Sequence, residues 1–192
     1  MENSVVNAAG KSDFEIKVVA ETTQWLENVV IGLNLCPFAK PVHTKRLIRF
    51  VVSAATTNEA LLADLRSEMQ FLVKTASEVI DTTLLIHPSV LADFFRYNAF
   101  LEDSNQELEE MELDGVIQIA SFHPDYQFAG SKISDVTNCT NRSPFPMLHL
   151  LREESVTRAL EGYPNPERIY ERNMATLLSL GKTGLEALLK HP

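Results

Sequence analysis

The pair His123 and Asp125 joins the two residue types that general acid–base chemistry uses. An imidazole titrates near neutral pH, and a carboxylate can orient the ring or stabilise its charged form. Tyr126 follows directly and adds a phenol that donates or accepts a hydrogen bond. The alternative interpretation is structural, because a histidine in this position can also cap the end of a strand by bonding to the backbone. The two-residue spacing is compatible with both interpretations.

Arg142 is the candidate for binding an anion. Its guanidinium suits bidentate capture of a carboxylate or a phosphate, and the surrounding Asn138, Asn141 and Ser143 offer further hydrogen bonds. In the competing interpretation, Arg142 pairs with Asp125 or Asp135 and holds its own loop closed. The sequence gives these two roles equal support.

His149 and Arg152 extend the candidate anion site. The pattern predicts a helix over residues 147–161, where positions three apart share one face. The N-terminus of that helix would itself favour an anion. Alternatively, Glu153 pairs with the neighbouring basic groups on a solvated face.

Cys36 is a candidate nucleophile. A buried cysteine is usually an inert small apolar residue, and the apolar neighbours of Cys36 favour that interpretation. A reactive thiolate is the alternative, because four basic residues follow before residue 50 and nearby cations favour the thiolate. These residues are Lys40, Lys45, Arg46 and Arg49. The predicted helix before Cys36 opposes the thiolate, since its C-terminus carries negative partial charge.

Metal and cofactor motifs are missing from the sequence. Histidines and cysteines occur singly, without the close pairs that typical zinc sites use. The 7 glycines do not cluster as phosphate-binding loops and dinucleotide sites require. We therefore expect neither a metal nor an organic cofactor.

The elements that position these residues alternate between strands and helices. Strands are predicted at 47–53, 82–87 and 116–122, and helices at 13–35, 57–76, 89–102, 104–114, 147–161 and 165–180. This order is typical of crossover units with parallel strands. We expect a single α/β domain over residues 13–192, with a small, mainly parallel sheet, helices on its faces and a helical C-terminal part. Residues 1–12 are expected to be flexible.

Two of the predicted strands end in the same dipeptide. His87-Pro88 follows the second strand and His123-Pro124 the third. Ligands of open α/β sheets collect at the carboxyl ends of the strands, so both imidazoles are expected at one edge. A long segment without a predicted element, residues 122–146, begins there, and such segments are usually functional or disordered. Its aromatic residues favour an ordered loop. His87 is therefore a further candidate for binding substrate, unless it only caps its strand.

Charge limits the classes of partner. The chain has 192 residues and a formal net charge of −9, which argues against non-specific binding to nucleic acid or to an anionic membrane. Seven acids lie in residues 102–114, whereas residues 120–192 hold eight acids and eight bases. An anionic small molecule therefore remains compatible with the candidate site.

The expected location is the cytosol. The first twelve residues do not follow the signal-peptide pattern, and no apolar run reaches the roughly 20 residues of a spanning helix. The two cysteines are expected to stay as thiols there.

Three motifs carry a resemblance to a known family: residues 29–39 (VVIGLNLCPFA), 120–130 (ASFHPDYQFAG) and 141–153 (NRSPFPMLHLLRE). With them the sequence, from about residue 23 to 180, resembles the mostly bacterial Domain of Unknown Function 1415 family. The resemblance implies that nine residues belong to the family pattern: Cys36, His123, Asp125, Tyr126, Asn141, Arg142, Ser143, His149 and Arg152. It implies no activity or substrate.

Our leading hypothesis is a small enzyme acting on an anionic small molecule. His123 would be the acid or base, Asp125 would orient it, and Arg142 with Arg152 would bind the anion. Cys36 and His149 would be the next participants. A non-catalytic ligand-binding or regulatory module is the alternative, and a metal-binding protein is the third. Converging side chains around open space would favour the enzyme, whereas mutual pairing without space would favour a structural role.

Overall fold

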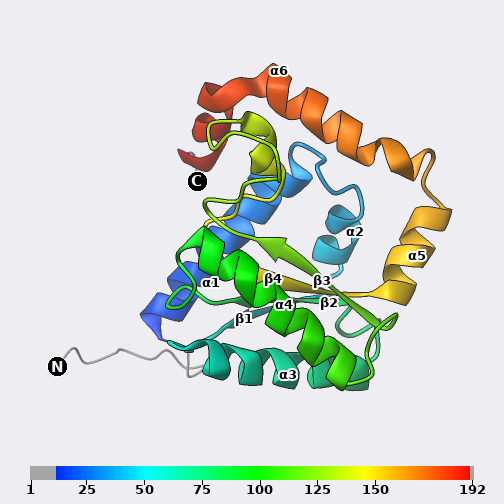
Figure 1. Cartoon of the computed structure of the whole chain (residues 1–192). Helices are drawn as coiled ribbons and strands as arrows, with labels where there is room; N and C mark the ends of the chain where they lie inside the picture. The colour runs from blue at the N-terminus through cyan, green and yellow to red at the C-terminus, as the bar shows by residue number, and fades with distance from the viewer. Residues whose placement is uncertain (1–11, 191–192) are drawn as a thin grey trace.

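A single four-stranded sheet organises the chain, and a computed structural model describes residues 12–190 (Figure 1). The expected flexibility of residues 1–12 concerns a segment that, apart from Ser12, lies outside the described residues. The strands are β1 (Ile48–Val52), β2 (Thr82–Ile86), β3 (Ile117–Phe122) and β4 (Met147–Arg152), in the order β1-β2-β4-β3. The first three confirm the predicted strands within one or two residues.

The sheet is mixed, which corrects the expectation of a mainly parallel one. β1 pairs with β2 in parallel, but β4 lies between β2 and β3 and runs antiparallel to both. The predicted helix over 147–161 is wrong in its first six residues, because α5 begins only at Glu153 and ends at Glu161. Pairing on both sides buries Leu148 and Leu150 of β4, and this tertiary pairing outweighs the local helical pattern.

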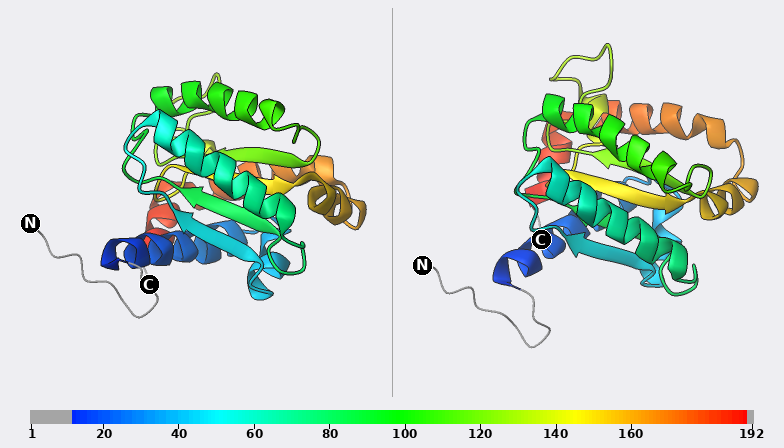
Figure 2. Two further views of the ribbon diagram at one scale, coloured as in Figure 1. Left: turned by 90° about the horizontal axis from the view of Figure 1, so that it is seen from below. Right: turned by 60° about the horizontal axis from the view of Figure 1, so that its bottom comes forward.

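One face of the sheet packs against α3 (Asn58–Lys74) and α4 (Phe94–Glu110), which lie together on the same side in Figure 2. Their core includes Leu61, Leu65, Met69, Tyr97, Phe100, Leu148 and Leu150. The two helices predicted between residues 89 and 114 are one helix, α4. Ser104, where the second of these helices was predicted to begin, lies inside α4 and donates its hydroxyl to the carbonyl of Phe100 (3.0 Å).

The other face packs against α1 (Asp13–Trp25), the π-helical segment η1 (Leu26–Ile31) and part of α6 (Ile169–Lys190). The predicted helix over 13–35 therefore loses α-helical geometry after Trp25. Position 32, directly after the π segment, requires glycine, because a Cβ there would clash with the carbonyl oxygen of Asn28. π-Helical turns are rare and occur frequently at functional sites.

The remaining elements are short. They are α2 (Ala39–Thr44), the 3-10 turns η2 (Val136–Thr140) and η3 (Pro166–Arg168), and the C-terminal part of α6 beyond the kink at Gly181. The kink lies where the sequence predicts the helix to stop, since Gly181 has a φ of 66°. Within residues 12–190, no helix has both the length and the apolar composition needed to cross a membrane.

Candidate functional site

The two His-Pro dipeptides lie at the same edge of the sheet, as expected from the sequence. β2 and β3 run in the same direction, because each is antiparallel to β4, and His87 and His123 follow their last residues. The start of β4 lies between them, and His87 bonds through its N–H to the carbonyl of Pro146 (3.0 Å). Both imidazoles are fully buried, with an exposed fraction of 0%.

Tyr97 of α4 packs between the two histidines. Its ring centroid lies 5.7 Å from that of His87 and 5.1 Å from that of His123. The buried phenol donates to the carbonyl of Met147 (2.8 Å) and accepts the N–H of Phe122 (3.0 Å). Tyr97 therefore ties α4 to the end of β3 and the start of β4. It was not among the candidates from the sequence.

Both ring nitrogens of His123 are hydrogen-bonded to the backbone. Nδ1 accepts the N–H of Asp125 (3.0 Å), so the neutral ring carries its proton on Nε2, which donates to the carbonyl of Leu91 (3.2 Å). Burial lowers the pKa of His123 below its ordinary value, and nearby acidic and carbonyl groups offset only part of this effect. His123 is thus a neutral ring without a free hydrogen-bonding atom.

Asp125 contacts His123 through its backbone, not through its carboxylate. The N–H of Asp125 makes the hydrogen bond, while the residue itself is exposed. The carboxylate acts on the ring only through its charge, which raises the pKa of His123 slightly against the larger effect of burial.

His87 differs from His123 in having one unpaired nitrogen. Its Nδ1 donates to the carbonyl of Val90 (3.1 Å), which leaves an unprotonated Nε2. This Nε2 is buried and has no hydrogen-bond partner among residues 12–190. Burial lowers the pKa of His87 to about 4, and the neighbouring His123 adds to the effect.

Arg142 holds the long loop together, through carbonyls instead of the carboxylates considered from the sequence. Its Nε donates to the carbonyl of Tyr126 (3.1 Å) and its Nη2 to that of Ile133 (2.7 Å). The carbonyl of Arg142 in turn accepts the indole N–H of Trp25 (2.9 Å). These bonds favour the loop-closing role over the capture of an anion.

Asn138 of η2 is a second residue whose side chain holds the loop together. Its buried side chain accepts the N–H of Phe128 (3.1 Å) and the hydroxyl of Ser131 (2.8 Å), and it donates to the carbonyl of Lys132 (2.8 Å). Three bonds from one fully buried amide fix the turn of the loop around η2.

Asn141 and Ser143 also bond within the structure. The side-chain amide of Asn141 donates to the carbonyl of Ser121 (3.0 Å). The backbone carbonyl of Asn141 accepts the backbone N–H of His123 (3.2 Å). The hydroxyl of Ser143 donates to the carbonyl of Phe145 (2.7 Å). Asn141 therefore fastens the loop to the end of β3, whereas Ser143 stabilises the loop just before β4.

His149 and Arg152 do not share a face, because they lie on strand β4 and not on a helix. Positions three apart on a strand point to opposite sides of the sheet. Arg152 stands at the far edge and donates to the carbonyls of Leu72 (2.5 Å), Thr75 (2.5 Å) and Ile80 (3.2 Å). The proposed anion clamp of Arg142 and Arg152 is thus not assembled.

Cys36 and Cys139 are free and partly buried. Burial raises the pKa of the Cys36 thiol, and hydrogen bonds from the backbone of Phe38 and Ala39 offset part of this rise. Cys36 is therefore a thiol at neutral pH, which favours packing over nucleophilic attack. Among residues 12–190, no three histidine, cysteine or acidic side chains converge as a metal site requires.

The match to a protein family spans the whole of this arrangement. Residues 17–187 match the family described as Protein of unknown function (DUF1415). The chain belongs to the DUF1415 family. The matched region includes the loop, both buried histidines and Cys36. Neither the curated proteins nor the solved structures gave a match.

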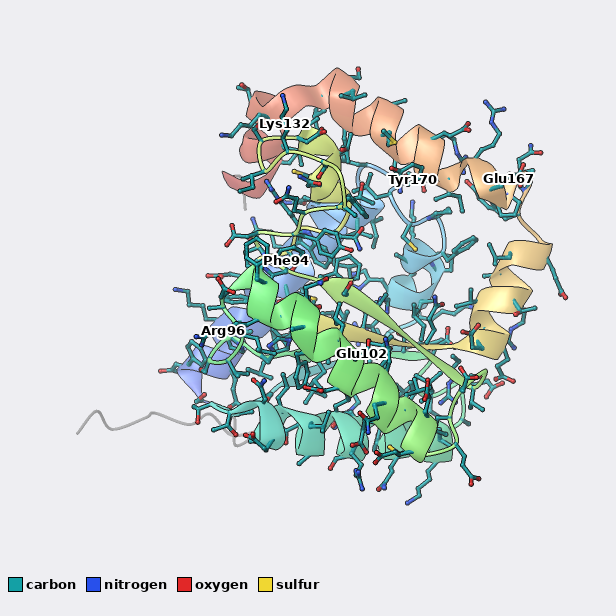
Figure 3. The ribbon with its side chains drawn as sticks, viewed as in Figure 1. Phe94, Arg96, Glu102, Lys132, Glu167 and Tyr170 are labelled. Carbon is teal, nitrogen blue, oxygen red and sulfur yellow. The ribbon has the colours of Figure 1, made fainter. Side chains whose placement is uncertain are left out.

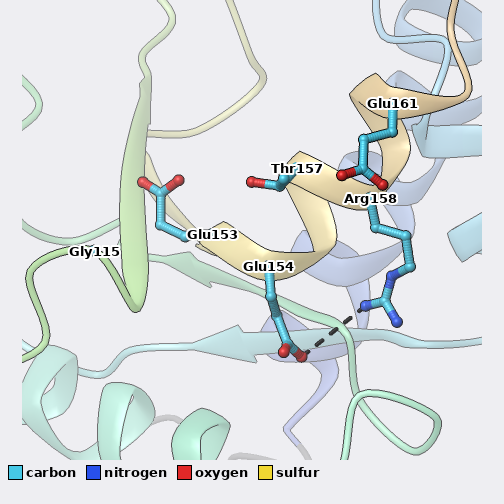
Figure 4. Close-up of a pocket in the computed structure, with 6 residues that line it drawn as sticks. All are labelled: Gly115, Glu153, Glu154, Thr157, Arg158 and Glu161. Atoms are coloured by element: carbon cyan, nitrogen blue, oxygen red, sulfur yellow. Dashed lines mark ion pairs between the residues drawn. The ribbon is translucent and has the colours of Figure 1, made fainter.

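Two surface hollows of this DUF1415 chain lie away from the loop. One, of about 520 Å³, lies at the opposite edge of the sheet beside α5 (Figure 4). It is lined by Gly115, Glu153, Glu154, Thr157, Arg158 and Glu161. The second, of about 320 Å³, lies beside α6 and is lined by Leu33, Asn34, Arg172, Asn173, Ala175 and Thr176. Neither contains a sequence-predicted site residue.

Proposed function

We propose that the chain is a non-catalytic binding module that holds a partner protein against the outer side of the long loop. The proposal rests on one observation: the polar side chains of the loop bond to one another and to the backbone, while one aromatic ring is exposed and three neighbouring rings are partly exposed. We call Phe94, Phe95, Tyr126 and Phe128 the loop surface. Phe95 is 78% exposed, and the other three are partly buried.

The rings of the loop surface form a continuous path outward from the buried histidine. Phe94 contacts His123 (5.4 Å between centroids), Phe95 (6.3 Å) and Tyr126 (5.3 Å), and Tyr126 contacts Phe128 (5.0 Å). The scaffold below therefore fixes the positions of the rings. Contiguous exposed apolar groups on a rigid support are typical of interaction sites.

A protein suits this surface better than a small molecule does. Small ligands bind in concave sites, and neither of the two hollows is lined by the loop surface. Aromatic anchors with a charged rim are typical of protein interfaces. Four exposed charges of both signs lie on the two segments that carry the rings: Asp93, Arg96, Asp125 and Lys132. Figure 3 shows Phe94 and Arg96 at the start of α4, with Lys132 on the loop. We therefore expect a partner face that is apolar at its centre and carries both signs of charge.

An acid–base enzyme centred on His123 fits this geometry less well. A general base needs a free lone pair within reach of its substrate. Nδ1 of His123 already accepts a hydrogen bond, and the ring is fully buried. Mutual pairing of the loop side chains supports the structural role that the sequence left as the alternative to the enzyme, and a binding module is compatible with such a loop.

A photoreactive residue at position 95 tests the proposal in the cells that make the protein. We expect irradiation to give a defined covalent adduct from position 95 and none from position 79, because Val79 is also exposed (61%) but lies at the other edge of the sheet. Excess wild-type protein should suppress the adduct. Phe95→Asp protein should reach the same suppression only at a concentration at least about 30-fold higher, since losing an interface anchor costs about 2 kcal/mol of binding free energy.

Three results would contradict the proposal. The first is no adduct at position 95, and the second is the same set of adducts at positions 95 and 79. The third is equal suppression by wild-type and Phe95→Asp protein, which would show that the adduct does not depend on the loop surface.

A further inference from the structure

The hollow of about 320 Å³ beside α6 is lined by one cationic side chain and by no acidic one. We call it the α6 hollow, and its lining residues are Leu33, Asn34, Arg172, Asn173, Ala175 and Thr176. The hollow beside α5 differs, because three glutamates line it. Of these two hollows, the α6 hollow is therefore the one that suits an anion.

Asn173 brings a buried acceptor to the α6 hollow. The residue is only 6% exposed, and its Nδ2 donates to the carbonyl of Leu35 (2.8 Å). This bond orients the amide and joins α6 to the segment between η1 and α2, which runs beside it in Figure 1. Oδ1 of Asn173 makes no hydrogen bond within the described residues and is not an enclosed atom. Because Asn173 lines the hollow, this oxygen can accept a hydrogen bond from a ligand there.

Arg172 is held in place but keeps free donors. Its guanidinium lies 5.2 Å from the centre of the Tyr163 ring, which in turn packs edge-on against Phe38 (5.3 Å between centroids). Nε donates to the carbonyl of Arg168 (3.4 Å), whereas the two Nη groups make no hydrogen bond or ion pair within residues 12–190. The neighbouring acid, Glu171, pairs with the guanidinium of Arg168 instead (3.6 Å). Arg172 can therefore bind an anion without first breaking an ion pair.

We propose that the α6 hollow binds a small carboxylate that has one negative charge and also carries a hydroxyl group. The Nη groups of Arg172 would donate to the carboxylate, and the hydroxyl of the ligand would donate to Oδ1 of Asn173. Asn34 and Thr176 offer further donors, because their side chains make no hydrogen bond within the described part of the chain. The α6 hollow is separate from the loop surface, and its role does not depend on the function proposed for that surface.

The ligand class follows from the charge and the size of the hollow. One guanidinium balances one negative charge, and its planar fork matches a carboxylate. A phosphate monoester carries up to about two charges, so part of its charge would have no counter-charge among the lining residues. The volume of about 320 Å³ lies at the lower end of the range for ligand sites, roughly 300–1,000 Å³, and so suits a small molecule.

Lactate is a suitable probe, because it is a small carboxylate with one hydroxyl. Propionate is its matched control without the hydroxyl, and lactamide is its matched control without the charge. In a titration at pH 7.5 and constant ionic strength, we expect lactate to shift the backbone NMR signals of residues 33–34 and 172–176 saturably. Propionate should bind about 2- to 10-fold more weakly, which is the range for one neutral hydrogen bond, and lactamide at least about 10-fold more weakly.

Two variants locate the probe. Arg172→Gln should weaken lactate binding at least about 10-fold, because it removes the counter-charge. Arg158→Gln makes the same change at the hollow beside α5 and should leave lactate binding unchanged. Both arginines are exposed, so neither substitution is expected to unfold the chain.

Three results would overturn the proposal. The first is the absence of a saturable shift at the α6 hollow of the wild-type protein. The second is lactate binding no tighter than that of propionate or of lactamide. The third is equal binding of lactate by the Arg172→Gln and Arg158→Gln proteins.

Discussion

Acidification from pH 7 to pH 4 is expected to remove about 3 kcal/mol of stability through His87 alone. Burial lowers the pKa of His87 to about 4 in the folded chain, whereas the unfolded imidazole keeps its ordinary value of about 6.5. Between these two values the unfolded chain binds more protons than the folded chain. The contribution is therefore complete above pH 6.5 and falls as the pH decreases towards 4. His149, whose pKa is also lowered to about 4, adds a loss in the same direction.

Urea unfolding at several pH values between 7.5 and 4 measures this loss. The matched variant is His87→Phe, which keeps a ring against Tyr97 but cannot titrate. We expect the free energy of unfolding of this variant to depend less on pH than that of the wild type. Equal pH dependence of the two proteins would show that His87 is not the source.

His123→Ala is expected to destabilise the chain by about 3–5 kcal/mol, from the cavity and the unpaired groups that it leaves. The substitution leaves the carbonyl of Leu91 and the N–H of Asp125 without their partners. Leu91 has a φ of 59°, a conformation that is unfavourable for leucine, and its bond to His123 helps to hold it there. Urea unfolding at pH 8, where the ring is neutral in both states, isolates this effect.

Two control variants accompany His123→Ala. His123→Gln restores a donor and an acceptor and should recover part of the loss. Asp125→Asn should change the free energy of unfolding by less than about 0.5 kcal/mol, because it alters an exposed carboxylate and keeps the backbone N–H. An unchanged stability of His123→Ala would contradict the structural role and return His123 to the catalytic hypothesis.

The sequence predicts the strands of this fold better than the sheet they form. β1, β2 and β3 are bounded by clear turn and cap residues, and their local patterns agree with their final environment. β4 was predicted as helix because its residues are compatible with both structures, and only pairing with β2 and β3 decides between them. The mixed topology and the separation of His149 from Arg152 both follow from that strand.

The sequence predicts where the candidate residues lie in the fold, but it does not predict which atoms they contact. The repeated His-Pro dipeptide correctly predicts that His87 and His123 lie at one edge of the sheet, whereas the role of that edge stays a prediction. Hydrogen bonds to carbonyls, such as those of Arg142, cannot be predicted in this way, because every residue carries a carbonyl. Tyr97 could have been found from its helical spacing three residues after Phe94, which places both rings on one face of α4. Asn138 is predicted from the sequence as a hydrogen-bonding residue near Arg142, but its three partners are not, since they meet only in the folded loop.

The central claim is that His123 is a neutral, hydrogen-bonded part of the scaffold beneath the loop surface. The most direct test is a long-range ¹H–¹⁵N NMR spectrum of its imidazole as a function of pH. We predict a single neutral form, protonated on Nε2, and a ring that is less than half protonated at pH 6.5, where an ordinary histidine is half protonated. A ring that is half protonated at pH 6.5, or that exchanges between its two neutral forms, would contradict the claim.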